Sequence, residues 1–259
     1  KVYDIPEGGR AAKGRAIVNL IGCDPEEKVS AFISVKEFNE DHFVVMATEK
    51  GMVKKTKLSA YSNPRKKGIY AVEIREGDRL IEARVSTGDN DILLGTRNGK
   101  SIRFSEEQIR ASGRKTMGVK GITLSSEDDK LVGMLLIKRD GTVLVATEKG
   151  FGKRTEISQY RAQKRGGKGV LTMKTTDKVG KMVTIKEVVE KDDLMIITNQ
   201  GVLIRLPVSQ IRSIGRATQG VKLIKLGEGT LVSSITRIMT EEEKKEDGED
   251  ANSEQPAEG

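Results

Sequence analysis

Apolar and polar residues alternate along most of the chain in short runs, with a period of two residues rather than the 3.6 residues of a helix. In four places an apolar, β-branched run is followed by a Thr-x-x-Gly turn and a second alternating run. The turn segments are TEKGMVKKT (48–56), TRNGKSIRF (96–104), TEKGFGKRT (147–155) and TNQGVLIRL (198–206). This pattern predicts four β-hairpins whose glycines adopt a positive φ angle.

A second, glycine-rich motif interleaves with the hairpins at nearly the same spacing. It reads GGRAAKGRAIVNL (8–20), NPRKKGIYAVEI (63–74), GRKTMGVKGITL (113–124), QKRGGKGVLTMK (163–174) and GRATQGVKLIKL (215–226). Each copy ends in a strand-like run, and a further run follows, as in KVSAFISV (28–35) and RLIEARVS (79–86). The chain therefore consists of repeats of about fifty residues, each with four short strands.

Four-stranded repeats of this length predict an all-β fold, a propeller-like ring of blades. The predicted strands do not make up whole four-stranded repeats, because the two runs after Gly220 have no hairpin of their own. We expect the missing hairpin upstream of Lys1, so that the fold is truncated at its N-terminus. We place the ring in residues 1–239 and expect residues 240–259 to form a disordered acidic tail.

The charge of the chain divides between these two parts. The net charge is +8, from 46 Lys and Arg against 38 Asp and Glu. Residues 241–259 hold nine acidic residues and two lysines, a net of −7, which leaves +15 on residues 1–240. A body this basic indicates a polyanionic partner, most often nucleic acid. The apolar runs are too short to span a membrane and no signal peptide opens the chain, so we expect a cytoplasmic protein.

Basic residues recur at fixed positions of the repeat, which predicts a belt of positive charge on one rim of the ring. Four residues after the hairpin glycines stand Lys55, Arg103, Arg154 and Arg205. In the glycine-rich loops stand Arg10, Lys13, Arg65, Lys66, Lys67, Arg114, Lys115, Arg165 and Arg216. The alternative is that these side chains cap the connections between blades by donating hydrogen bonds to carbonyls.

The densest basic loop is Gln163-Lys164-Arg165-Gly166-Gly167-Lys168-Gly169. Its glycines let backbone N–H groups approach phosphates, and its cations neutralise their charge. Aromatic residues make up only 3% of the chain, which disfavours stacking on single-stranded bases. These features favour binding to the backbone of duplex DNA with little sequence preference. A propeller that binds protein partners and an RNA-binding scaffold remain alternatives.

Groups suited to catalysis are nearly absent from the sequence. His42 and Cys23 are the only residues of their types, which excludes a disulfide and a Cys-based zinc site. The segment GTRNGKS (95–101) has one residue too few between its glycines for a phosphate loop. We expect no catalytic residue, metal or cofactor in this chain.

The segment QKRGGKG (163–169) resembles the box that marks the C-terminal domain of the A subunit of bacterial DNA gyrase. The segments TEKGFGKRT, GVKGITL, DLMIIT, GVLIR and GRATQGV are similar to that domain as well, so the resemblance covers residues 1–239. It implies a β-pinwheel, a propeller whose blades exchange strands, with six blades in the parent and duplex DNA wrapped around the rim.

The resemblance also implies partners and an activity for the whole enzyme. These are the remainder of the gyrase A subunit, the ATP-hydrolysing gyrase B subunit in an assembly of two A and two B subunits, and negative supercoiling by a type II topoisomerase at the nucleoid. The family's catalytic tyrosine belongs to a different domain. The sequence differs from the family in one respect. Its closest match to the family's box, QKRGGKG (163–169), lies in the fourth of the five glycine-rich loops, whereas in the family the box precedes the first blade. The C-terminal domain of the A subunit of topoisomerase IV is therefore an alternative.

Overall fold

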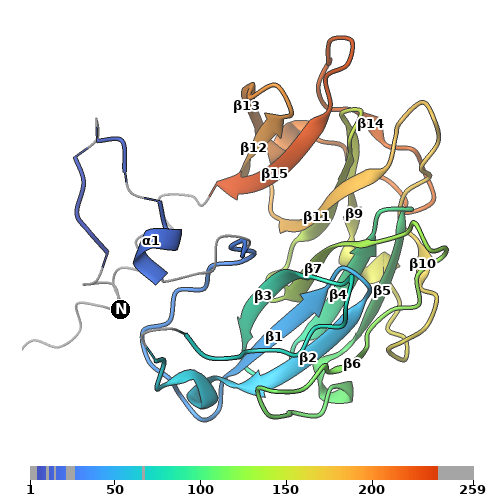
Figure 1. The fold of residues 1–259 in the computed structure, drawn as a ribbon. Helices are drawn as coiled ribbons and strands as arrows, with labels where there is room; N and C mark the ends of the chain where they lie inside the picture. Colours follow the sequence, from blue (N-terminus) through green and yellow to red (C-terminus); the bar gives the residue numbers. More distant parts are fainter. Residues whose placement is uncertain (1–4, 10–11, 15, 22–26, 66–67, 239–259) are drawn as a thin grey trace, which may run out of the picture.

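The computed structural model describes residues 5–9, 12–14, 16–21, 27–65 and 68–238, and almost all of its regular structure is β (Figure 1). One short helix, α1 (Val18–Ile21), precedes the strands. The long strands are β1 (Phe43–Thr48), β2 (Met52–Lys57), β3 (Leu80–Ser86), β4 (Asp91–Thr96), β5 (Lys100–Ser105), β7 (Leu131–Ile137), β8 (Thr142–Thr147), β9 (Phe151–Glu156), β11 (Met182–Val188), β12 (Asp193–Thr198), β13 (Leu203–Pro207) and β15 (Val232–Ile238). Three two-residue strands complete the set, namely β6 (Val119–Lys120), β10 (Val170–Leu171) and β14 (Val221–Lys222).

The strands form four small antiparallel sheets arranged in a ring, which confirms the all-β, propeller-like prediction. From the inner to the outer edge the sheets are β3-β1-β2-β6, β7-β4-β5-β10, β11-β8-β9-β14 and the three-stranded β15-β12-β13. The four predicted hairpins are β1–β2, β4–β5, β8–β9 and β12–β13. The inner strands β3, β7, β11 and β15 lie side by side around the centre (Figure 1).

Neighbouring sheets exchange their outer strands, as the resemblance implies. Strand β10 follows β9 in the chain, yet it pairs with β5 of the preceding sheet, Val170 opposite Ser101. A Cβ on Gly169 would lie 2.3 Å from the carbonyl oxygen of Ser101, and its φ is +67°. Glycine is therefore required here both for the backbone conformation and for the close approach of two chains. Strands β6 and β14 repeat the arrangement on β2 and β9.

Three predicted strand segments do not form strands in the structure. The run in 8–20 contains the helix α1, and residues 28–35 and 68–74 lie outside any strand. A strand needs a hydrogen-bonding neighbour, and within the described residues no hairpin pairs with either of these last two segments. Phe32 and Tyr70 are 75% and 74% exposed. The apolar side chains Ile33, Val35, Ala71 and Val72 are half-buried against the cluster of Val44, Met46 and Leu58.

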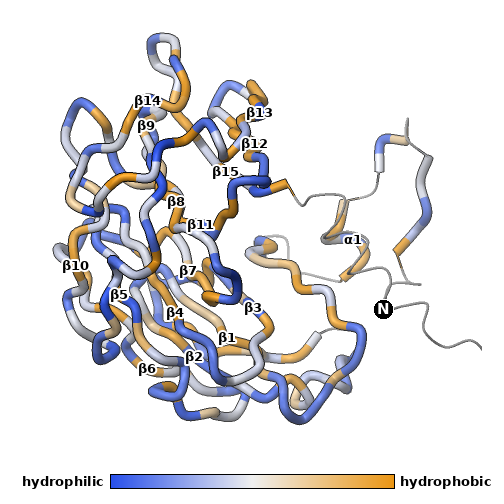
Figure 2. Tube along the Cα trace, turned by 180° about the vertical axis from the view of Figure 1, so that it is seen from behind, coloured by the Kyte–Doolittle hydropathy of each residue, from blue (hydrophilic) through white to orange (hydrophobic). Residues whose placement is uncertain are grey.

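The core lies between neighbouring sheets, so both faces of a central strand are buried. On β4, Leu94 packs with Val45 and Val53 of the first sheet, whereas its neighbour Leu93 packs with Val143 of the third. Figure 2 shows apolar residues along the strands and hydrophilic residues on the outer loops. Of the described helices, none is long and apolar enough to cross a membrane.

After each of the four hairpins the chain makes a short 3₁₀ turn. These turns are η2 (Leu58–Tyr61), η3 (Glu106–Gln108), η4 (Ile157–Gln159) and η5 (Val208–Gln210). After η3, η4 and η5, the glycine-rich loop crosses to the neighbouring sheet and enters its outer strand. The topology thus places the loops 113–118, 163–169 and 215–220 at equivalent places on the outer rim.

Candidate nucleic-acid interface

Lysines of the glycine-rich loops stand in solvent on the outer rim. Lys164 and Lys168 of the densest loop are exposed, and so is Lys115 of the preceding one. Lys120 on β6 and Lys222 on β14 are exposed as well. Because β6, β10 and β14 are the outer strands of three successive sheets, these ammonium groups follow one edge of the ring.

The arginine of each loop has a different position, because it holds the loop against the neighbouring sheet. The half-buried Arg165 donates from Nε to the carbonyl oxygen of Gln108 at 2.9 Å and from Nη1 to that of Lys120 at 3.2 Å. Its backbone N–H donates to Oε1 of Gln108 at 2.9 Å. Lys164 and Lys168 therefore stand in solvent, whereas Arg165 donates to carbonyl oxygens of the neighbouring sheet, which is the alternative considered for these loops.

We call these contacts of the loop arginine with a glutamine and with carbonyl oxygens the arginine clasp. Arg216 repeats the clasp one sheet further along. Its Nη1 donates to the carbonyl oxygen of Leu171 at 2.8 Å, and its backbone N–H donates to Oε1 of Gln159 at 3.4 Å. Gln159 ends η4 as Gln108 ends η3. The recurring Gln–Arg contact fixes the loop, so its lysines are presented from a rigid backbone.

Two buried lysines support the loops from beneath. Lys153 donates from Nζ to the carbonyl oxygens of Gly215, at 2.6 Å, and Arg216, and to Oγ1 of Thr218 at 3.0 Å. Lys54 likewise donates to the carbonyl oxygens of Ala71, at 2.6 Å, and Arg114. Burial lowers the pKa of each ammonium group to about 8, and the positive charge of the loop arginine contributes to this lowering.

The hairpin cations Lys55 and Arg154 do not reach the rim, which corrects the sequence prediction. Lys55 is 6% exposed, and its Nζ lies 3.5 Å from the carboxylate of Glu106 and 4.8 Å from the ring centre of Phe43. Arg154, also 6% exposed, donates from Nε to the carbonyl oxygen of Ile211 at 2.7 Å. Both side chains cap connections between blades, which is the alternative considered for this set.

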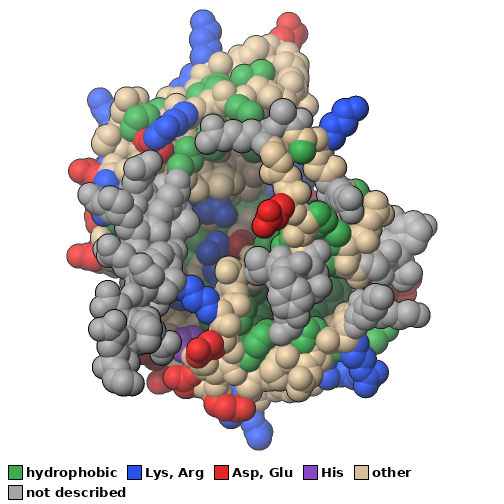
Figure 3. All heavy atoms as spheres, turned by 90° about the vertical axis from the view of Figure 1, so that its left-hand side faces the viewer, with side chains coloured by type: hydrophobic (Ala, Val, Ile, Leu, Met, Phe, Trp, Pro, Cys, Tyr) green, Lys and Arg blue, Asp and Glu red, His purple; other side chains and the backbone are tan. Residues whose placement is uncertain are grey.

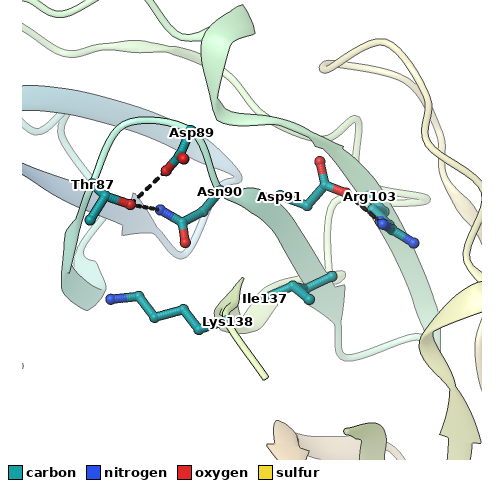
Figure 4. Close-up of a pocket in the computed structure, with 7 residues that line it drawn as sticks. All are labelled: Thr87, Asp89, Asn90, Asp91, Arg103, Ile137 and Lys138. Carbon is teal, nitrogen blue, oxygen red and sulfur yellow. Dashed lines mark hydrogen bonds and ion pairs between the residues drawn. The ribbon is translucent and has the colours of Figure 1, made fainter. Parts of the chain in front are cut away.

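The other two hairpin arginines form ion pairs at the ends of their strands. Arg103 lies 2.6 Å from the carboxylate of Asp91 and donates to the carbonyl oxygens of Ile157 and Tyr160 at 3.2 Å each. Figure 4 shows its guanidinium group beside Asp91, at the edge of a pocket of about 540 Å³ that Lys138 also lines. Arg205 is exposed and pairs with Asp193.

The remaining predicted positions divide between exposed, half-buried and undescribed residues. Lys13 and Arg65 are exposed, on segments outside the four sheets, and Arg114 is half-buried. Gln163 is half-buried, and its carbonyl oxygen accepts from Nε2 of Gln108 at 3.2 Å. Arg10, Lys66 and Lys67 lie outside the described residues.

The structure adds three exposed cations that the sequence analysis left out. Arg110, Arg161 and Arg212 each follow a 3₁₀ turn and enter a rim loop, and all three are exposed. Their spacing of 51 residues matches that of the anchor glycines, so the same test for recurrence could have found them. With the five lysines they make eight exposed cations on the described part of the rim, a surface suited to contacting phosphates.

Comparisons with known proteins find similarity along almost the whole chain. The family model described as DNA gyrase C-terminal domain, beta-propeller, matches residues 1–36, 42–87, 90–138, 141–188 and 192–238. The DNA gyrase A subunit of Staphylococcus aureus (strain NCTC 8325 / PS 47) is 44% identical over 257 residues, which cover 98% of this chain and 28% of that protein. The same subunit from Staphylococcus epidermidis (strain ATCC 12228 / FDA PCI 1200) is 44% identical over 246 residues, or 94% of this chain and 27% of that protein.

Solved structures agree with the ring of sheets. The crystal structure of the C-terminal domain of DNA topoisomerase IV superposes with a TM-score of 0.84 at 25% identity, covering 92% of this chain and 76% of that one. The structure of a DNA gyrase A C-terminal domain gives a TM-score of 0.79 at 22% identity, covering 88% of this chain and 76% of that one. The chain spans little more than a quarter of the length of the gyrase proteins that it matches.

Proposed function

Because this chain belongs to the DNA gyrase C-terminal domain family, we propose that its outer rim binds duplex DNA through the phosphate backbone and bends it around the ring. The observation that carries the proposal is the row of exposed lysines along the outer strands and the loops that enter them, with Lys164 and Lys168 on a loop that Arg165 holds. The contacts are directed to phosphates, so binding depends little on base sequence.

Bending duplex DNA costs free energy, and contacts between the rim and the phosphates must offset this cost. Curving a few tens of base pairs costs on the order of 1–10 kcal/mol. Each phosphate neutralised by a lysine or arginine releases condensed counterions, which offsets this cost. Loops held by Arg165 and Arg216 keep the cations in place before DNA arrives, so less side-chain and loop ordering opposes binding.

In the whole enzyme, the wrapped segment would be delivered to the domain that cleaves DNA. We propose that this chain works with the remainder of the gyrase A subunit, together with the ATP-hydrolysing gyrase B subunit, in an assembly of two A and two B subunits at the nucleoid in the cytoplasm. The role of the chain there is to give strand passage a direction, which results in negative supercoiling. The gyrase A relatives at 44% identity favour this assignment over topoisomerase IV.

The proposal is tested with the purified chain, a nicked circular plasmid and DNA ligase. Wrapping changes the linking number of the sealed plasmid in proportion to the amount of bound chain, and gel electrophoresis measures that change. The double variant Lys164→Ala/Lys168→Ala should lose most of it. Binding without any change in linking number would refute wrapping, and an equal change for both proteins would refute the role of this loop.

A further inference from the structure

The inner edges of the four sheets enclose a second basic region, distinct from the rim. A cavity of about 750 Å³ lies between β3, β7, β11 and β15, with residues 32–34 on one side. Figure 3 looks into this hollow and shows Lys and Arg side chains within it. The proposed DNA contacts lie on the outer strands, so this region has no part in them.

Cations outnumber carboxylates on the wall of the cavity. The lining residues include Glu187 as the one carboxylate and five cations, which are Arg84, Lys138, Arg139, Lys186 and Arg237. Just behind the wall the buried Asp192 binds two of the cations, Arg139 through Nη2 and Arg237 through Nη1, at 3.2 Å each. Glu82 pairs with Arg84 at 2.9 Å. With these two included, the described residues place three carboxylates against the five cations.

Lys186 and Arg84 stand at equivalent positions of β11 and β3, and both are short of partners. Lys186 Nζ makes no hydrogen bond or ion pair with a described residue, and Nε of Arg84 is buried without an acceptor. Burial lowers the pKa of the Lys186 ammonium group, and the positive charge of Arg84 lowers it further, whereas Glu82 raises it. Two like charges in a partly desolvated cavity cost stability unless a counter-charge is supplied.

We propose that this axial cavity is a binding site for a small polyvalent anion of the phosphate class, with Lys186 and Arg84 as its central ligands. Arg84 has a buried Nε without an acceptor, and Lys186 supplies a compact charge beside it, whereas Arg139 and Arg237 are held by Asp192 at the border of the site. An anion with several oxygens accepts from donors on β3 and β11 at once. A monocarboxylate has too few acceptors for this set.

The probe is pyrophosphate, titrated into the full chain at constant ionic strength, with calorimetry for affinity and thermal unfolding for stability. The test variant is Lys186→Met, and the matched control is Lys168→Met on the rim, which removes the same charge. We expect saturable binding to the parent and to the control, at least tenfold weaker binding to Lys186→Met, and a rise in Tm only where binding occurs.

The anion-free proteins give a second readout. Because burial and the charge of Arg84 oppose the Lys186 ammonium group more than Glu82 favours it, Lys186→Met should melt at a higher temperature than the parent when no anion is present, whereas loss of a structural contact would lower Tm. Equal pyrophosphate affinity for all three proteins, or a lowered Tm for anion-free Lys186→Met, would overturn the proposal. Arg84→Gln provides the same comparison if Lys186→Met does not fold. DNA affinity should fall for Lys168→Met alone, which separates this site from the rim.

Discussion

The salt dependence of DNA binding measures how many rim cations contact phosphates. Eight exposed cations occupy the rim loops and outer strands: Arg110, Lys115, Lys120, Arg161, Lys164, Lys168, Arg212 and Lys222. With about 0.9 counterion released per neutralised phosphate, log K should fall against log[salt] with a slope of about −7. Replacing Lys164 and Lys168 with Ala removes two contacts, so the slope should become about −5.

The same relation gives the loss of affinity. Two fewer contacts lower K by about sixtyfold at 0.1 M salt and by about twentyfold at 0.2 M, if the part of binding that does not depend on salt is unchanged. The assay is fluorescence anisotropy of a labelled duplex of mixed sequence, repeated from about 0.05 to 0.3 M salt, a range over which such contacts weaken strongly. The fold should be unaffected, since neither ammonium group packs in the core.

A control double variant shows whether DNA binding depends on the position of the lysines or only on the net charge of the chain. Lys130 and Lys178 are exposed, but they precede the inner strands β7 and β11 rather than the outer ones. Their replacement with Ala changes the net charge by the same amount. It should leave the slope within about half a unit of −7. If both double variants reduce the slope equally, binding follows net charge and the reasoning from loop position is refuted.

Further predictions concern the clasp, the strand exchange, a buried lysine and the tail. Arg165→Ala should destabilise the fold by about 1–2 kcal/mol in urea titrations through the two lost carbonyl contacts, whereas Lys164→Ala should not. Gly169→Ala should lower Tm far more than Gly229→Ala, because both have positive φ but only the first Cβ meets a backbone oxygen. The pKa of Lys153 is about 8 in the folded chain against 10.5 as its ordinary value, so the unfolded state binds more protons between these values and stability should rise with pH there; Lys153→Met should flatten that rise, and an unchanged pH profile would contradict the assignment. Deleting residues 241–259, which carry a net charge of −7, should tighten DNA binding several-fold at low salt and less as salt rises; equal affinities at low salt would contradict competition by the tail.

The sequence alone was sufficient for the local structure of the repeats. The positions of Gly51 and Gly150 between alternating runs predicted hairpins that the structure contains, because both signals act within ten residues. The recurrence of the glycine-rich motif predicted a ring of equivalent blades, and the charge count predicted a basic body. These features depend on backbone conformation and composition, which neighbouring residues largely determine.

Which strands pair was decided by tertiary structure. The run after Gly68 has the same pattern as the runs after Gly118 and Gly169, and only the latter two form strands. A strand is completed by a partner from another repeat, so its own residues cannot show whether that partner is present.

Whether each cation is buried or exposed also depended on the tertiary structure. Lys55, Arg154 and Lys164 all carry a positive charge in the repeated segments, yet the first two are buried and the third is exposed. In a sheet with one solvated face, alternation would have separated inward from outward positions. Here neighbouring sheets cover both faces of each central strand, so a cation on a hairpin must find carbonyls or carboxylates inside the ring. Only the loops that cross between sheets on the outer edge leave their lysines in solvent, and that location follows from the exchange of strands between repeats.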